Sequence, residues 1–256
     1  RTVRCYRGRI RRGLGVLWRA TLYDHQGDAH VLHRNLGPFG TTAIGLGEMP
    51  LTIENNLGHE GIETIHAALD AGCRHLDTAW AYYCSGGEEQ TGEKLIREAM
   101  ASWNGPKDEV TIATKVGHFR NFTDGRPTWD VDGAENLIKR GKESALALGV
   151  DTIDLLYFHR PDEGADNESV EAIKQLVDEG VAQGGISNAS IEQIDIARGI
   201  LGDKLIAVQN QYSPIYLDTA DTLEYTAKVG LNSVLEPLGG FRKPKDETKF
   251  DPFREI

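Results

Sequence analysis

Residues 153–159 read IDLLYFH, a short run that is apolar at nearly every position and ends on a polar residue. Six further short runs read as strands, and they cover residues 42–47, 73–77, 110–115, 184–188, 205–210 and 231–236. Longer stretches with helical spacing of apolar residues lie between them, at 60–71, 88–101, 134–148, 169–179, 190–201 and 219–229. Apolar strands that alternate with helices predict a parallel sheet covered by helices.

Two architectures alternate strands and helices in this way, the doubly wound open sheet and the (β/α)8 barrel. An open sheet that binds a nucleotide usually has the motif G-x-G-x-x-G after its first strand. Here residues 45–50 read GLGEMP, with Pro50 where a helix should begin. We therefore predict an α/β fold of the (β/α)8, or TIM barrel, type. Seven strands precede a polar tail that follows Leu235, so we expect a barrel truncated before strand eight.

Composition narrows the class of protein. The chain has 256 residues, of which 39% are hydrophobic and 26% charged, and its net charge is -11. An acidic protein of this kind is not a general nucleic-acid binder, because such binding needs a basic face. Without a run of about 18 apolar residues, no membrane span is expected. The three cysteines form no CxxC pair, which fits a reducing, cytoplasmic location.

The first residues differ from the rest. Residues 1–19 carry seven arginines and no acid, a composition found in transit peptides and basic arms. Because no long apolar region follows, we favour a plain extension that is poorly ordered. We accordingly divide the chain into a basic N-terminal extension at 1–33 and a barrel at 34–256 that lacks its C-terminal end.

Polar residues close three consecutive predicted strands. In a parallel barrel such strand ends point into the mouth of the active site. The strands end on Asp77, Lys115 and His159, and Tyr82 follows in the loop after Asp77. Taken singly, each has an ordinary explanation, such as a helix cap for the aspartate or a solvated lysine. All four on neighbouring strand ends are much harder to explain in that way.

These four side chains suit proton transfer to a carbonyl oxygen. A tyrosine has an unperturbed pKa near 10, and a neighbouring ammonium lowers that pKa. Asp77 can keep Lys115 charged, and Lys115 can then lower the pKa of Tyr82. His159 can hydrogen-bond the substrate oxygen and orient it. The set contains no obvious nucleophile and no zinc triad, so no metal is expected. A proton relay needs a partner reaction, and hydride transfer from a nicotinamide fits.

At these residues the sequence resembles the aldo-keto reductase family. The segments that carry the resemblance are HLDTAWAYY (75–83), IATKVG (112–117), DLLYFHRPD (154–162), EGVAQGGISNAS (179–190) and VQNQYSP (208–214). They occur in the family's order and spacing, and the resemblance runs from about Leu36 to Gly240. Each motif alone is weak, but five in register are a strong signal.

The resemblance implies a barrel enzyme that binds NADPH, or in some members NADH, and reduces small-molecule aldehydes or ketones. It makes Tyr82 the general acid, with its pKa lowered by Lys115 and Asp77, and it makes His159 the residue that orients the carbonyl. It assigns Ser187, Asn188 and Gln209 to the nicotinamide carboxamide. It also assigns the strand-seven residues Pro237, Leu238 and Gly239 to the cofactor.

Two departures from the family pattern matter. Leu235 and Glu236 stand where the family has an aromatic residue and a serine, so ring stacking is lost and a carboxylate lies near the expected pyrophosphate. The chain also stops at Ile256, before the family's basic residues for the adenosine phosphate. We therefore expect poor NADPH affinity and low activity. The main alternative is an inactive member that acts as a binding or regulatory subunit.

A second alternative is a different barrel enzyme, such as an isomerase that uses Lys115 as a Schiff-base amine. It would leave the Asn188 and Gln209 segments unexplained. The loops that choose the substrate are not readable. We expect a loop at 116–129 whose aromatic residues either line the pocket or pack over the barrel rim. The sequence carries no signal for an oligomeric state.

Overall fold

The computed structural model describes residues 22–23, 29–54, 57–123, 126–161, 167–213 and 216–236. The chain divides into two compact units. The first contains Arg1–Thr114, Arg120–Trp129 and Glu143–Leu155, and the second contains Lys115–Phe119, Asp130–Lys142 and Leu156–Ile256. Five elements contribute residues to both units, namely β7 (Thr111–Val116), β8 (His118–Thr123), β9 (Arg126–Val131), α3 (Ala134–Leu148) and β10 (Ile153–His159).

The first unit is built on a parallel array of strands. Its strands follow the order β5 (Leu46–Gly47), β6 (His75–Asp77), β7 and β10, and it also holds the single helical turn η1 (Pro50–Glu54), α1 (His59–Asp70), α2 (Thr91–Ser102) and η2 (Lys107–Glu109). Helix α1 buries Ile65, Ala68 and Leu69 and packs against α2. Helix α1 is terminated at Gly72, where φ is 93° and the N–H donates to the Leu69 carbonyl.

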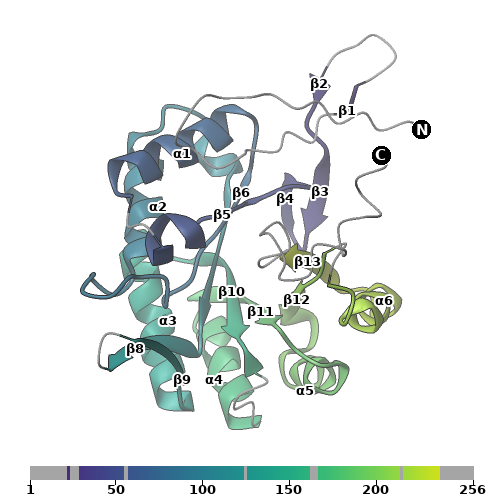
Figure 1. The fold of residues 1–256 in the computed structure, drawn as a ribbon. Helices are drawn as coiled ribbons and strands as arrows, with labels where there is room; N and C mark the ends of the chain where they lie inside the picture. Colours follow the sequence, from purple (N-terminus) through teal and green to yellow (C-terminus); the bar gives the residue numbers. More distant parts are fainter. Residues whose placement is uncertain are drawn as a thin grey trace. The chain divides into compact units, whose positions relative to one another are not determined.

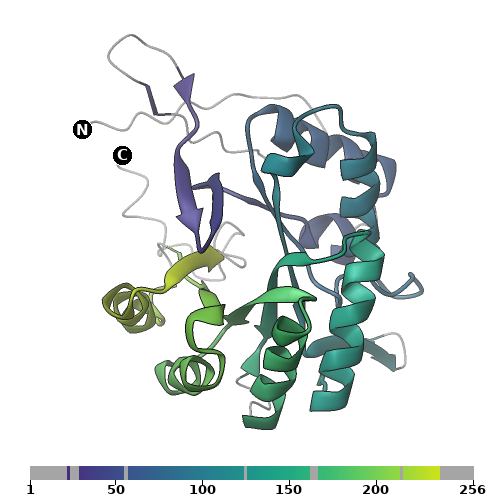
Figure 2. The same cartoon turned by 180° about the vertical axis from the view of Figure 1, so that it is seen from behind.

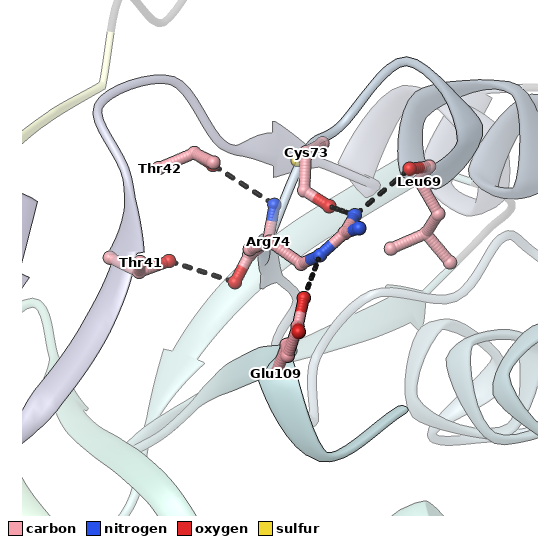
Figure 3. A network of polar contacts seen from close by, with 6 residues as sticks. All are labelled: Thr41, Thr42, Leu69, Cys73, Arg74 and Glu109. Carbon is pink, nitrogen blue, oxygen red and sulfur yellow. Dashed lines mark hydrogen bonds and ion pairs between the residues drawn. The ribbon is translucent and has the colours of Figure 1, made fainter. Parts of the chain in front are cut away.

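A hairpin that the sequence did not predict precedes β5. It consists of β3 (His33–Leu36) and β4 (Phe39–Thr42), which pair antiparallel, as do the shorter β1 (Leu22–Tyr23) and β2 (Ala29–His30). Arg74, which directly precedes β6, is hydrogen-bonded to β4 (Figure 3). Its backbone N–H donates to Thr42 Oγ1 at 2.9 Å, and its carbonyl accepts from Thr41 Oγ1 at 2.8 Å. The guanidinium donates to the Leu69 carbonyl at 2.9 Å and to Glu109 at 3.1 Å.

The second unit continues the parallel order. Its strands are β10, β11 (Ala182–Ser187), β12 (Leu205–Gln211) and β13 (Asn232–Glu236), and its helices are α4 (Asn167–Asp178), α5 (Ile191–Leu201), η4 (Gly202–Lys204) and α6 (Ala220–Val229). Helix α4 packs on β11, α5 on β11 and β12, and α6 on β13. Figures 1 and 2 show α5 and α6 side by side along these strands. Helix α5 begins with a capping box between Ser190 and Gln193.

Each of the seven predicted strands and six predicted helices is present in the described part of the chain, with ends displaced by a few residues. The predicted loop at 116–129 is wrong. It forms β8 (His118–Thr123) and β9 (Arg126–Val131), which pair with each other. After an Asp-Gly pair in the sequence, Pro127, Trp129 and Val131 alternate with polar residues, a pattern that favours a strand and a hairpin. No helix in the described ranges is long and apolar enough to cross a membrane.

Candidate active site

The first unit holds Asp77 and Tyr82. Asp77 is the last residue of β6, where it pairs with Gly47 of β5 and Ala113 of β7. Its carbonyl accepts from the Glu48 N–H at 3.0 Å. Tyr82 is buried in the segment between β6 and α2, and its carbonyl accepts from the Gly92 N–H at 3.0 Å. Backbone bonds to neighbouring elements therefore fix both ends of this segment.

Two buried glutamates, Glu48 and Glu93, also lie in the first unit, and the sequence had not singled them out. Glu93 accepts hydrogen bonds from Thr114 Oγ1 at 2.6 Å and from Gln90 Nε2 at 2.8 Å. Burial raises the pKa of Glu93 to about 6, although hydrogen bonds from Thr114, Ser144 and Gln90 act in the opposite direction. The helical spacing of α2 does contain a signal, because Glu93 falls on its buried face beside Leu95 and Ile96.

The second unit places three basic side chains together. Lys115 near the end of β7 and His159 at the end of β10 are both buried. His118, also buried, lies beside His159 with its ring nearly perpendicular and the two centroids 5.5 Å apart. Burial first, and then the charges of Lys115, His118 and Arg160, hold the pKa of His159 well below its ordinary value of 6.5. His159 is therefore neutral near pH 7, in the form that can both donate and accept a hydrogen bond.

Polar side chains also end β11 and β12 in this unit. Ser187 and Gln209 are buried and lie opposite each other in the parallel register. The Asn188 N–H donates to the Gln209 carbonyl at 2.9 Å, and Asn188 Nδ2 donates to Ser187 Oγ at 3.0 Å and to Glu236 Oε1 at 3.2 Å. Asn210 binds Ala189, the residue after Asn188, with two hydrogen bonds. Its side-chain amide accepts from the Ala189 N–H and donates to the Ala189 carbonyl.

The backbone is strained just beyond two of these strand ends. Arg160 follows His159 with φ of 58°, and Asn188 follows Ser187 with φ of 55°. Asparagine tolerates this left-handed region, whereas an arginine there costs about 1–2 kcal/mol. The Arg160 N–H donates to the Ser187 carbonyl at 3.2 Å, so the strained residue links two neighbouring strand ends. Strain of this kind gathers at functional sites.

The structure thus brings Lys115, His159, Ser187, Asn188 and Gln209 to strand ends of one unit, whereas Asp77 and Tyr82 belong to the other unit. A hydroxyl and two side-chain amides fit a planar carboxamide, which offers one acceptor and two donors. Pro237, Leu238 and Gly239 lie outside the described residues. Among the described residues, no group of three His, Cys, Asp or Glu side chains is arranged to hold a metal ion.

Comparison with known proteins identifies the class. A sequence model described as "Aldo/keto reductase family" matches residues 43–255. Parallel strands with these polar ends and this match define a barrel oxidoreductase that depends on NAD(P)H. The chain belongs to the aldo/keto reductase family. The resemblance seen in the sequence and the predicted enzyme class are confirmed.

Individual relatives agree with this assignment. The chain is 30% identical over 230 residues to a 6-dehydroglucose reductase of Novosphingobium aromaticivorans, a match that covers 85% of this chain and 72% of that protein. It is 39% identical over 145 residues to the aldo-keto reductase YhdN of Bacillus subtilis, which covers 54% of this chain and 40% of that protein.

Solved structures show the fold. A Bacillus halodurans aldo-keto reductase in its holo form matches with a TM-score of 0.68 and 24% identity, over 85% of this chain and 71% of that one. A Gluconobacter oxydans glycerol dehydrogenase matches with a TM-score of 0.67 and 26% identity, over 79% and 62%. The predicted fold class, the (β/α)8 barrel, is confirmed.

Proposed function

We propose that this chain reduces the carbonyl group of an aldehyde or ketone with hydride from NADPH, and that Tyr82 supplies the proton. The observation that carries the proposal is the group of strand-end side chains in the second unit. It combines buried Lys115, neutral His159 and the amides of Asn188 and Gln209. The preference for NADPH over NADH and the cytoplasmic location belong to the same proposal.

Ser187, Asn188 and Gln209 would hold the nicotinamide by its carboxamide. The alternating donors and acceptors of these side chains fix which face of the ring is presented, and a bound nicotinamide cofactor supplies the hydride. By resemblance, Pro237, Leu238 and Gly239 would contact the rest of the cofactor. Exposed Leu235, next to Glu236 at the end of β13, would cover the ring by packing alone.

Proton delivery is assigned to the four remaining residues. The phenol of Tyr82 donates its proton to the carbonyl oxygen as negative charge develops there. A cation beside the phenol favours the phenolate, which is the role proposed for Lys115, and Asp77 balances that charge. Neutral His159 would hydrogen-bond and orient the substrate oxygen.

The substrate class proposed is a carbonyl compound that carries neighbouring hydroxyl groups. Two similar proteins act, by their names, on 6-dehydroglucose and on glycerol. In this chain His118 adds a second buried imidazole beside His159, and an imidazole can accept from or donate to a hydroxyl. Sugar-derived aldehydes and ketones are therefore the first compounds to test.

One observation favours a second candidate, a weakly active member that works as a binding subunit. Glu236 Oε1 already accepts a hydrogen bond from the Asn188 amide, one of the proposed carboxamide ligands. A carboxylate there also repels the phosphates of a dinucleotide. Low affinity for NADPH, with little carbonyl reduction, would match this candidate.

The two candidates are separated by a pair of tyrosine variants. Tyr82→Phe keeps the ring and removes the acidic proton, so we expect kcat to fall by about 10²–10⁴-fold. Tyr83→Phe is the matched control: Tyr83 is equally buried, but its hydroxyl donates to the Arg120 carbonyl at 2.6 Å. Oxidation of NADPH by a panel of hydroxylated carbonyl compounds is the assay. An active parent chain with equal loss in both variants, or none in Tyr82→Phe, would contradict Tyr82 as the acid; an inactive parent favours the subunit.

A further inference from the structure

A second carboxylate lies at the strand end next to Asp77. Glu48 directly follows β5, and it is almost wholly buried, with 1% exposure. Its two carboxylate oxygens are held separately, since Thr52 Oγ1 donates to Oε2 at 2.8 Å and Thr78 Oγ1 donates to Oε1 at 2.5 Å. Burial of a carboxylate is costly unless its oxygens are hydrogen-bonded. Glu48 is therefore kept in one position by two hydroxyls, and no step of the proposed reaction uses it.

Glu48 is joined to Asp77 through both its backbone and its side chain. The Glu48 N–H donates to the Asp77 carbonyl at 3.0 Å. Its carboxylate accepts from Thr78, the residue that follows Asp77, and the Thr78 N–H donates to the Ala113 carbonyl at 2.9 Å. The peptide between Asp77 and Thr78 is thus bonded on both sides, to Glu48 and to Ala113 of β7.

The Glu48 carboxylate also packs against Gly92, the residue whose N–H binds the Tyr82 carbonyl. A Cβ added to Gly92 would lie 2.1 Å from Glu48 Oε1 and 2.6 Å from Thr78 Oγ1, so a larger residue would force both side chains to move. The Gly92 N–H donates to the Tyr82 carbonyl. Gly92 also lies in the first turn of α2, where the positive end of the helix dipole favours a negative side chain.

We propose that Glu48 is a positioning residue, which sets the geometry of Asp77 and Tyr82 through its packed contact with Thr78 and Gly92. Asp77 is attached at one end of this contact and Tyr82 at the other. The inference rests on the proposed function only in that Tyr82 is taken as the acid. The contact itself consists of hydrogen bonds and packing within the first unit and can be tested without any cofactor.

The test removes one hydroxyl or one charge. Thr78→Val keeps the shape of the side chain and removes its bond to Glu48, Thr78→Ser restores the hydroxyl, and Glu48→Gln removes the negative charge. The matched control is Thr226→Val in α6, since Thr226 is equally buried and its hydroxyl donates to the Leu223 carbonyl at 2.8 Å. All four variants are compared with the parent chain by thermal unfolding.

Hydrogen exchange measured by mass spectrometry is the first readout. We expect amides of the 78–92 stretch to exchange faster in Thr78→Val and Glu48→Gln, and at the parent rate in Thr78→Ser and Thr226→Val. The second readout is kinetic: kcat should fall about 10–100-fold in Thr78→Val, with a smaller change in KM, because misplacement of a catalytic group slows the chemical step.

Unchanged exchange at 78–92 in both Thr78→Val and Glu48→Gln would overturn the proposal, whatever the activity. A local increase in exchange with an undiminished kcat in an active parent would overturn it as well, since Glu48 would then be an ordinary buried contact. A parent chain without carbonyl reduction counts against the proposed function alone, and the exchange result still decides whether Glu48 fixes the segment.

Discussion

Replacement of Glu93 by glutamine should change how the stability of the protein depends on pH. Burial raises the pKa of this carboxyl from its ordinary 4.5 to about 6 in the folded chain. Between these two values the folded protein binds more protons than the unfolded chain, so the free energy of unfolding falls as pH rises. Each pKa unit corresponds to about 1.4 kcal/mol, and the total loss attributable to Glu93 is therefore about 2 kcal/mol.

Glutamine cannot ionise, so the variant should escape this loss. Its hydrogen bonds with Thr114 and Ser144 will differ from those of the acid, but that difference is the same at every pH. The quantity to examine is thus the free energy of unfolding of the variant minus that of the parent. We expect this difference to increase by about 2 kcal/mol in favour of the variant between about pH 4 and pH 7.

Urea unfolding at a series of pH values, followed by tryptophan fluorescence, supplies the measurement. Glu98→Gln is the matched control, because Glu98 lies on the same helix but is exposed. A difference between Glu93→Gln and the parent that stays constant with pH would refute the reasoning, since the carboxyl would then ionise as readily in the folded chain as in the unfolded one.

Three further predictions follow from the geometry. Gly92→Ala should lower the free energy of unfolding by about 1–3 kcal/mol, because the new methyl group would lie 2.1 Å from Glu48 Oε1; an unchanged thermal midpoint would contradict this. Stability should also fall as pH drops through about 6.5, where His159 takes up a proton in the unfolded chain but not in the folded one, and His159→Gln should reduce that dependence in urea unfolding. Asp132→Asn should cost about 1–3 kcal/mol, because buried Asp132 Oδ2 forms an ion pair at 2.8 Å with the partly exposed Arg140, and a double variant with Arg140→Met should recover part of the loss.

The order of strands and helices was predictable because it rests on local patterns. Short apolar runs placed all seven parallel strands, and the helical spacing between them placed six helices. The β8–β9 hairpin was missed although the alternation in β9 and the Asp-Gly pair before it are visible in the sequence. The barrel interpretation led us to expect a loop after each strand, and that expectation outweighed the local pattern.

The site was predictable in part for the same reason. Parallel strand ends meet at one edge of a sheet, which allowed Lys115 and His159 to be grouped from the sequence. Glu93 could not be found in this way, because it lies on helix α2. Glu48 directly follows a predicted strand, but glutamate is almost always exposed unless it has partners, so its burial was not expected. Their partners, Thr78 and Thr114, lie far away in the sequence and become neighbours only in the folded chain.

The close approach of Glu48 to Gly92 also has an evolutionary consequence. A side chain at position 92 would displace the glutamate at position 48, because the added Cβ would lie 2.1 Å from Glu48 Oε1. We expect descendants of this chain to change the two positions together, with the residue at 48 shortened before or as the glycine is lost. Positions 48 and 92 are distant in the sequence, but they should covary, because a substitution at one limits which residues are tolerated at the other.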